Sequence, residues 1–171
     1  MPTRKDNMNF VTNRGESLNE IADNHKVLLV FLRHFGCTFC RETMADLAEV
    51  RQDIESTGVK IVIVHMVESD LAADMLKLYD LGDVPHISDI HQHLYDRFGF
   101  HKVSFRALFG LKNWWRAFVA GIVKGHLIGK PAGDPFQMPG VVLFHKKKVI
   151  NNFAYRYVSD RPDFIRVAKT A

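Results

Sequence analysis

Two apolar runs with a helical pattern between them place the strongest constraint on how this chain folds. Residues 27–32 (VLLVFL) and 59–67 (VKIVIVHMV) are largely apolar on both faces, as strands are when helices cover both sides of a sheet. Between them, Met44 and Leu47 begin a helical stripe, and Gly58 follows it as a helix stop. A strand, a helix and a second strand in this order predict parallel strands joined by a right-handed crossover.

Further patterns extend this unit into an α/β chain. We expect a short helix before the first strand, and after the second strand a helix that begins near Ser69 and ends before Gly82. An extended piece after Pro85 and a helix over 90–98 come next. Two apolar runs around a lysine-rich turn then predict an antiparallel hairpin, and a proline with acidic neighbours predicts a last helix. The two runs are 141–144 and 149–158, and the last helix covers about 160–171.

We expect a single domain over residues 1–171, with a central mixed β-sheet flanked by helices. With 171 residues, 47% of them hydrophobic, the chain is long enough for one core, and it has neither repeats nor a long linker. The longest apolar run, 27–32, is far too short to cross a bilayer, and the first 26 residues contain no signal-like apolar region. These observations predict a soluble, cytoplasmic protein.

The two cysteines of the chain, Cys37 and Cys40, lie where the first strand passes into the helix. A sulfur at the start of a helix faces unpaired N–H groups and the positive end of the helix dipole, which lowers a cysteine pKa. We expect Cys37 to be accessible, whereas Cys40 lies one turn further on, in line with Met44 on the core-facing side. Attack on a substrate followed by resolution requires an activated sulfur and a sheltered partner. The spacing therefore predicts a redox pair.

Five neighbouring residues are candidates for supporting the pair. Gly36 lets a substrate approach the sulfur closely, and Arg33 and His34 add positive or polarisable groups. Pro139 directly precedes a strand that we expect beside the first strand, so that it and Met138 would approach the cysteines. A proline there can take the cis form at a tight turn, although the position also suits an ordinary proline at the start of a strand.

Two other interpretations of the cysteine pair remain open. Free cysteines are often buried small side chains without chemistry. A zinc site would need further ligands, and the chain has only one CxxC motif and no second pair at ligand spacing. The histidines that could complete such a site are His34, His65, His86, His91, His93 and His101. His65, inside an apolar run, is most simply a core histidine. We therefore predict neither a metal site nor a cofactor.

The basic charge of the chain is concentrated in one segment. Residues 97–133 contain seven Lys or Arg and no Asp or Glu, whereas the net charge of the whole chain is +4. Apolar residues within 104–130 recur at helical spacing and predict a helical insertion at about 100–133, which covers one end of the sheet. Alternatively, a basic amphipathic helix would contact an anionic membrane surface or an acidic protein. A nucleic-acid partner is not predicted, because no recognised binding module is present.

Four motifs occur in an order that is specific to one group of proteins. They are "VLLVFLRHFGCTFCRE", "YDRFGF", "GDPFQMPGVVLFHKKKV" and "YVSDRPDF". In this order they resemble the peroxiredoxin-like branch grouped as alkyl hydroperoxide reductase and thiol-specific antioxidant related proteins, including the selenoprotein-L-like members. The resemblance implies a thioredoxin-like fold, a redox pair at Cys37 and Cys40, and a cis-proline at Pro139.

The resemblance also raises the question of which cysteine attacks first. Typical peroxiredoxins carry a PxxxTxxC motif whose final cysteine is the peroxidatic one. Aligned on that cysteine, this chain has Arg33, Cys37 and Cys40 at the three specified positions. Helix geometry favours Cys37 as the attacking sulfur, whereas the alignment favours Cys40.

Together, the residues and the resemblance predict a thiol-disulfide oxidoreductase, or peroxiredoxin-like antioxidant protein, whose Cys37–Cys40 pair cycles between dithiol and disulfide. The substrate would be a disulfide or a peroxide, and an external thiol of thioredoxin or glutathione type would reduce the pair. One alternative is a true thiol peroxidase in which Cys40 is oxidised first to sulfenic acid. Another is a non-enzymatic metal-binding or membrane-surface module.

Overall fold

The computed structural model describes residues 9–102, 133–134, 136–157 and 159–169. The strands are β1 (Val27–Phe31), β2 (Lys60–His65), β3 (His86–Ser88), β4 (Gly140–His145) and β5 (Lys148–Ala154). The helices of the described residues are α1 (Leu18–Asn24), α2 (Thr38–Glu55), α3 (Ser69–Lys77), α4 (His93–Arg97) and α7 (Phe164–Ala168). The segment 104–130, for which we predicted a helical insertion or a surface helix, lies outside the described residues.

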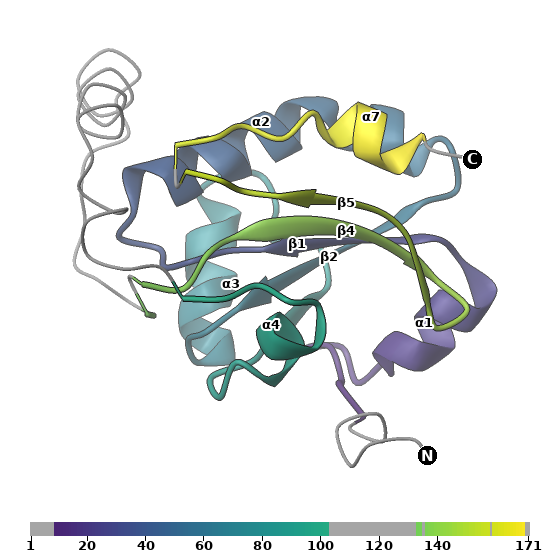
Figure 1. The fold of residues 1–171 in the computed structure, drawn as a ribbon, viewed down its shortest axis with the longest axis horizontal. Helices are drawn as coiled ribbons and strands as arrows, with labels where there is room; N and C mark the ends of the chain where they lie inside the picture. Colours follow the sequence, from purple (N-terminus) through teal and green to yellow (C-terminus); the bar gives the residue numbers. More distant parts are fainter. Residues whose placement is uncertain (1–8, 103–132, 135, 158, 170–171) are drawn as a thin grey trace.

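A five-stranded mixed sheet in the order β3-β2-β1-β4-β5 forms the centre of the fold (Figure 1). β1 runs parallel to β2, with Leu29 opposite Val62, and antiparallel to β4, with Leu29 opposite Val142. β3 pairs in parallel with β2, and β5 pairs antiparallel with β4 to close the hairpin. The predicted mixed sheet and C-terminal hairpin are therefore confirmed.

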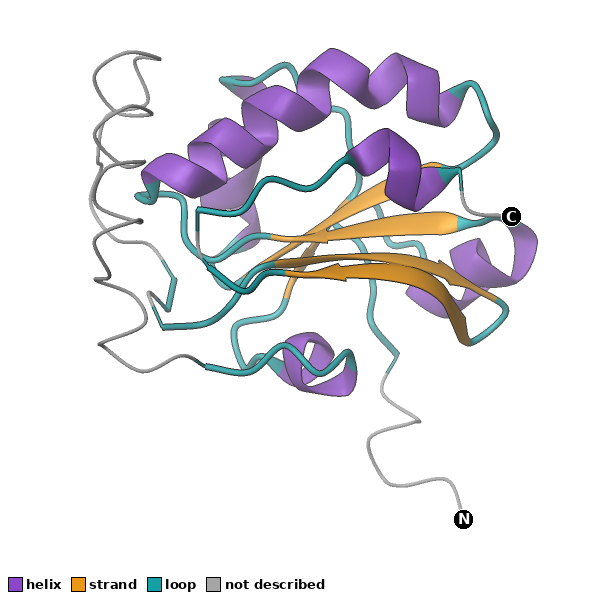
Figure 2. Cartoon of the chain, turned by 45° about the horizontal axis from the view of Figure 1, so that its top comes forward, coloured by secondary structure: helices purple, strands orange, loops and turns teal. Residues whose placement is uncertain are grey.

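Helices cover both faces of the sheet because its strands are apolar on both faces. Successive side chains of a strand point to opposite sides. Leu28 and Val30 accordingly pack with buried side chains of α2, α3 and α7, whereas Leu29 and Phe31 pack with those of α1 and α4. Figure 1 shows α2 and α7 on one side of the sheet and α1 and α4 on the other, and Figure 2 shows the long α2 lying along the sheet. This arrangement fixes where the end of β1 meets the start of α2.

The predicted start of the helix over 90–98 is wrong, since α4 begins only at His93. The carboxylate of Asp89 accepts hydrogen bonds from the N–H groups of His93 (2.9 Å) and Leu94 (2.7 Å). Because a carboxylate in this position satisfies the unpaired N–H groups of a first turn, it sets where the helix begins. Gln92, just before the helix, adopts a left-handed φ of 61°.

The ends of the last elements also differ from the prediction. β5 ends at Ala154 because the carboxylate of Asp160 accepts hydrogen bonds from the N–H groups of Arg156 and Tyr157, both at 2.9 Å, which turns the chain away from the sheet. α7 begins at Phe164, because the acid that caps it is Asp163. Of the acidic residues that predict the last helix, Asp163 caps it, whereas Asp160 forms the turn after β5.

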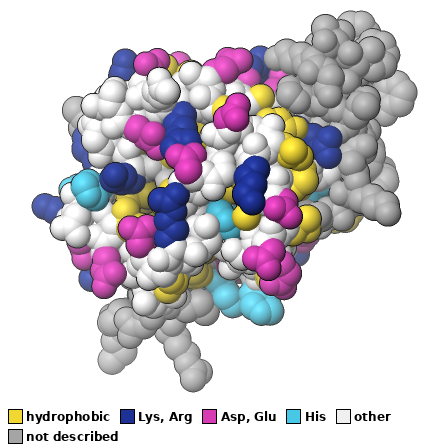
Figure 3. Space-filling view, turned by 180° about the vertical axis from the view of Figure 1, so that it is seen from behind, with side chains coloured by type: hydrophobic (Ala, Val, Ile, Leu, Met, Phe, Trp, Pro, Cys, Tyr) yellow, Lys and Arg dark blue, Asp and Glu magenta, His cyan; other side chains and the backbone are white. Residues whose placement is uncertain are grey.

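The described surface is mixed in charge. Figure 3 shows acidic and basic side chains interspersed over one face. Ion pairs connect distant parts of the chain, as between Arg51 and Asp83 (2.5 Å) and between Arg161 and Asp46 (2.5 Å). Among the helices of the described residues, none is long and apolar enough to span a membrane.

Gly140, the first residue of β4, leaves no room for a side chain. A Cβ there would overlap the ring of Phe100, which packs against Phe31 at a centroid distance of 4.9 Å. We expect Gly140→Ala to lower the free energy of unfolding, measured by urea denaturation, by about 1–3 kcal/mol, because the ring cannot move without disturbing the core. This cost should largely disappear when Phe100→Ala is introduced as well. An equal cost in both backgrounds would show that the overlap is not its cause.

Candidate active site

The first feature of the site is the position of Cys37 at the N-terminus of α2. Cys37 is the residue before the first helical one, with an extended backbone (φ −81°, ψ 125°). Its N–H donates to the carbonyl of His34 (3.0 Å), and its carbonyl accepts from the N–H of Arg41 (3.0 Å). The predicted strand-to-helix junction is thus confirmed, and the sulfur of Cys37 lies beside the unpaired N–H groups of the helix.

Arg33 binds Cys37 directly. Its Nη2 lies 2.8 Å from the Sγ of Cys37, and only 6% of the Arg33 surface is exposed. Burial opposes the charge on Arg33, yet the negative charge of Cys37 and the hydrogen bond to its sulfur outweigh burial and raise the pKa of the guanidinium above its usual value. The sequence predicted a positive group nearby; the structure gives a buried, charge-assisted hydrogen bond, which is stronger than a neutral one.

The two cysteines have opposite pKa shifts. The pKa of Cys37 lies well below its ordinary value, because the Cys40 thiol donates a hydrogen bond to it and Arg33 adds a positive charge, and these effects outweigh burial. The same hydrogen bond, together with burial and the negative charge of Cys37, raises the pKa of Cys40 well above its ordinary value. The two shifts therefore favour a thiolate on Cys37 and a thiol on Cys40.

Both sulfurs are enclosed. Cys37 is 5% exposed and Cys40 is 3% exposed, and the two cysteines lie 4.0 Å apart without a bond. The prediction that Cys37 is accessible is therefore wrong for this state, because the side chain of Arg33 folds inward onto its sulfur. The prediction that Cys40 is sheltered is confirmed. A separation of this size leaves the sulfurs close enough to bond after a small movement.

His34 and Gly36 lie in the same loop. Burial lowers the pKa of His34, so that Arg33 rather than this imidazole supplies the positive charge at neutral pH. His34 forms an isolated β-bridge with Gly133, whose φ is 116°. A Cβ on Gly133 would lie 2.8 Å from the carbonyl oxygen of Arg33, so only glycine lets these backbones pack. Gly36 is buried in the turn before Cys37, and its role in substrate approach stays a prediction.

Met138 belongs to a small apolar cluster beside the CxxC motif, and its predicted role in supporting the cysteines stays a prediction. It packs with Tyr155 and with Phe39, the second residue between the two cysteines. Its N–H donates to the carbonyl of His101 at 3.3 Å. Pro139, however, follows a trans peptide bond, since the described residues contain no cis peptide bond. The cis-proline is therefore a wrong prediction, and the chain keeps the trans form that X–Pro bonds favour by about 0.5–1 kcal/mol.

Two residues that the sequence analysis did not single out hold this loop. Tyr95 of α4 is fully buried, and its hydroxyl donates to the carbonyl of Leu32 and lies 3.2 Å from that of Val64. It therefore ties α4 to the residue before Arg33. Asp89 in turn fixes α4 through its cap. The signal for Asp89 was an acid just before a helical pattern. Tyr95 lies in the motif "YDRFGF", which marked the segment but not this contact.

A buried histidine pair lies behind the loop. His65 and His86 are each 1% exposed, and Nε2 of His65 lies 2.8 Å from Nδ1 of His86. Because the carbonyl of Val67 can only accept, Nδ1 of His65 donates to it (3.1 Å) and its Nε2 accepts from His86. The ring of Phe35 packs on His65 at 5.8 Å. His65 is thus the satisfied core histidine that the sequence predicted.

The buried histidine pair should make the free energy of unfolding depend on pH. Burial, with the nearby His86, lowers the pKa of His65 to about 3. An unfolded histidine binds a proton below about pH 6.5. The unfolded state therefore holds more protons between these values, and the free energy of unfolding should fall by up to about 1.4 kcal/mol per pH unit from pH 6.5 toward pH 3. Urea denaturation over this range should give a shallower slope for His65→Leu than for the exposed control His101→Gln. Identical slopes would refute the assignment.

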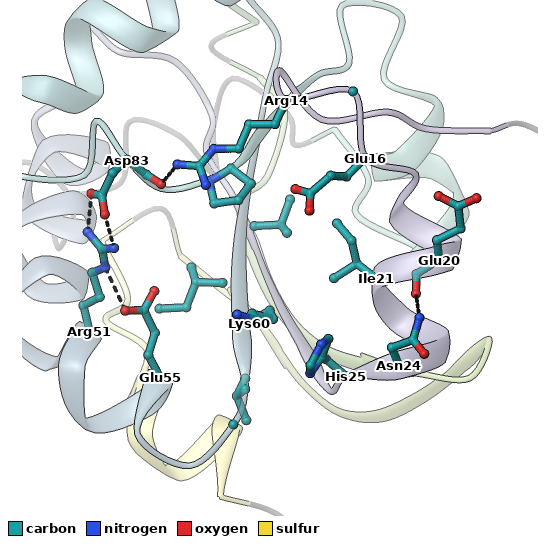
Figure 4. A pocket seen from close by; sticks show the side chains of 16 residues that line it. Arg14, Glu16, Glu20, Ile21, Asn24, His25, Arg51, Glu55, Lys60 and Asp83 are labelled. Atoms are coloured by element: carbon teal, nitrogen blue, oxygen red, sulfur yellow. Dashed lines mark hydrogen bonds and ion pairs between the residues drawn. The ribbon is translucent and has the colours of Figure 1, made fainter.

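A pocket in the part of the chain that the structure describes lies away from the cysteine pair. A pocket of about 910 Å³ lies between α1 and the C-terminal end of α2, where Arg51, Asp83 and Glu55 form one wall and Glu20 lies on the other (Figure 4). Its lining includes neither cysteine. Within the described ranges, no three His, Cys, Asp or Glu side chains are grouped to hold a metal ion.

Comparisons with known proteins agree with this fold. The model of the AhpC/TSA family matches residues 8–152. A prostamide/prostaglandin F synthase of Danio rerio is 24% identical over 167 residues, which are 94% of this chain and 81% of the relative. Two solved structures share the fold. A peroxiredoxin 6 of Arenicola marina gives a TM-score of 0.64 at 13% identity, with 95% of this chain and 67% of that chain covered. A peroxidoxin, BcpB, of Mycobacterium tuberculosis gives 0.61 at 14% identity, with 95% and 91% covered. The chain therefore belongs to the AhpC/TSA family and has a peroxiredoxin-like thioredoxin fold.

Proposed function

We propose that this chain is a thiol-disulfide oxidoreductase in which Cys37 attacks and Cys40 resolves. The observation that carries the proposal is the buried hydrogen bond from Arg33 to the sulfur of Cys37, at 2.8 Å. It stabilises the thiolate, which is the nucleophilic form of cysteine. Cys40 lies 4.0 Å away and has a raised pKa, which supports it as the thiol that would complete the disulfide.

The reaction would proceed in two exchanges. The Cys37 thiolate attacks one sulfur of a substrate disulfide, forms a mixed disulfide and expels the first substrate thiolate. Cys40 then loses its proton and attacks the Cys37 sulfur, which forms the Cys37–Cys40 disulfide and expels the second thiolate. Two electrons pass from the protein to the substrate. An external thiol of thioredoxin or glutathione type then reduces the protein.

Formation of the mixed disulfide would itself prepare Cys40 for the second exchange. In the resting pair, the hydrogen bond to Cys37, burial and the negative charge of Cys37 all raise the pKa of Cys40. Once Cys37 is bonded to substrate, its negative charge is gone. The pKa of Cys40 then falls, because a group loses its proton more easily when a neighbouring negative charge is removed. The first exchange thus favours the second.

A peroxide is a second candidate substrate, which membership of the AhpC/TSA family favours. In that reaction the Cys37 thiolate attacks one peroxide oxygen, forms a sulfenic acid and releases water or an alcohol. Cys40 then attacks the sulfenic sulfur, releases water and gives the same disulfide. The raised pKa of Cys40 disfavours Cys40 as the first sulfur to be oxidised.

We propose a cytoplasmic location for either activity, as the sequence predicted.

Mass spectrometry after one equivalent of oxidant tests the proposal. Wild type, Cys37→Ser and Cys40→Ser are treated in parallel with hydrogen peroxide and with a small symmetrical disulfide. We expect the small disulfide to convert the wild type to an internal disulfide two mass units lighter, and Cys40→Ser to a mixed disulfide at Cys37. If hydrogen peroxide forms the internal disulfide and the small disulfide does not, the activity is that of a peroxidase and not disulfide exchange. If neither oxidant reacts with either cysteine, both proposed reactions are wrong.

A further inference from the structure

We propose that the buried Arg33–Cys37 pair makes the Cys37–Cys40 disulfide a strong oxidant, which a small monothiol of the glutathione class is sufficient to reduce. This inference rests on the proposed function, because it requires that the disulfide forms. It names the class of the reductant, and it restricts the oxidant of the proposed reaction to a peroxide or to a disulfide that is more oxidising than the Cys37–Cys40 pair.

The pair is held in place by its surroundings. Arg33 follows Leu32, whose carbonyl accepts a hydrogen bond from the buried hydroxyl of Tyr95. Gly133 packs against the carbonyl of Arg33 from the other side. These contacts hold the backbone at Arg33, and the guanidinium is itself buried beside the Cys37 sulfur, so little ordering has to take place when the thiolate forms.

The thiolate and the disulfide differ in charge, and this difference sets the redox equilibrium. In the reduced protein, Arg33 and the Cys40 thiol both donate to a negatively charged Cys37 sulfur. In the disulfide, that sulfur is neutral and Cys40 no longer has a proton to donate. Charge-assisted hydrogen bonds are roughly twice as strong as neutral ones and gain further strength when buried. The surroundings therefore stabilise the reduced form selectively, and a disulfide whose reduced form is stabilised is a strong oxidant.

A monothiol would reduce the Cys37–Cys40 disulfide in two successive exchanges. One thiolate attacks the Cys37 sulfur, breaks the Cys37–Cys40 bond and leaves Cys40, which takes up a proton. A second thiolate attacks the added sulfur, forms a small disulfide and releases Cys37 as a thiolate. Two electrons pass from the two monothiols to the protein. Because Cys37 is a stable thiolate, it is a good leaving group in the second step.

The equilibrium between wild type and glutathione gives a first test that needs no variant. The measured constant is that for oxidation of the dithiol by glutathione disulfide, with the oxidised fraction read by mass after acid quenching. The titratable groups that face Cys37 are Arg33, His34 and Cys40. When Cys37 is already a thiolate, oxidation consumes one proton, so the constant should fall about tenfold per pH unit across pH 6 to 8. A constant independent of pH in this range would overturn the inference.

Variants of Arg33 give the second test. We expect Arg33→Met to raise the constant at pH 7 by at least about tenfold, which corresponds to a potential lower by roughly 30 mV, and Arg33→Lys to give a smaller rise. The matched control is Arg51→Met, which removes the same charge near the other end of α2, where Arg51 binds Asp83. If Arg33→Met fails to fold, judged by its circular dichroism, Arg33→Lys and the wild-type pH series still decide.

The outcomes separate this inference from the proposed function. A disulfide that forms with the same equilibrium constant in wild type, Arg33→Met and Arg51→Met leaves the oxidoreductase standing but overturns the role of Arg33. A rise in the Arg33 variants alone supports the inference. If no Cys37–Cys40 disulfide forms under any glutathione ratio, the proposed function fails and the inference fails with it.

Discussion

Cys37→Ser should abolish exchange with a small disulfide, with a loss of rate on the order of 10³-fold or more. A serine hydroxyl stays protonated at neutral pH and cannot replace a stabilised thiolate as the nucleophile. The remaining thiol, Cys40, keeps the burial that raises its pKa, so it should not take over. The measurement is the release of a chromogenic thiol from an aromatic disulfide under single-turnover conditions.

Cys40→Ser is the matched control for this prediction, because it removes the other sulfur of the same motif. It should keep the first exchange, release one equivalent of thiol and stop as a stable mixed disulfide at Cys37. Wild type should release two equivalents. If Cys37→Ser reacts and Cys40→Ser does not, the attacking sulfur is Cys40, as the alignment with typical peroxiredoxins favours.

Asp89→Ala should destabilise the protein by about 2–3 kcal/mol. The carboxylate of Asp89, 4% exposed, accepts from the N–H groups of His93, Leu94 and Tyr95 at 2.9, 2.7 and 3.4 Å. Without it, these buried donors lose their partner. Tyr95 would then be held less firmly against the carbonyl of Leu32, next to the residue that binds Cys37.

The loss is measured as the free energy of unfolding in urea at pH 7. Asp89→Asn keeps an accepting oxygen and should lose less, whereas Asp70→Ala removes an exposed acid from the first turn of α3 and should change little. If Asp70→Ala costs as much as Asp89→Ala, the loss comes from charge and not from the cap. Thiol reactivity of Asp89→Ala should fall as well, because α4 positions the loop of Arg33.

The sequence was sufficient for the parts of the fold that depend on local pattern. The two apolar strands and the periodic helix between them occur as β1, α2 and β2, because burial on both sides of a parallel sheet leaves a clear pattern in the residues. The position of the cysteine pair followed from the same pattern. The sequence predicts α4 to begin too early, because the start of this helix depends on Asp89, whose carboxylate accepts from the N–H of His93, four residues further along the chain.

The geometry of the site depended on contacts that pattern does not encode. Arg33 lies in the loop two residues after β1, where a charged side chain more often points to solvent, and its inward turn onto Cys37 also buries that sulfur. Tyr95 reaches Leu32 across 63 residues of sequence. Pro139 had two conformations open to it from sequence, and the structure has the trans form.

The most direct test of the central claim is a titration of thiolate absorbance against pH in wild type, Cys37→Ser and Cys40→Ser. In wild type one thiol should titrate well below the ordinary cysteine pKa of about 8.5 and the other well above it. The low titration should vanish in Cys37→Ser and persist in Cys40→Ser, because Arg33 stays beside Cys37 and a serine hydroxyl can still donate a hydrogen bond to its sulfur. Two thiols that titrate together in the ordinary range, or a low titration that survives in Cys37→Ser, would contradict the assignment of Cys37 as the activated sulfur.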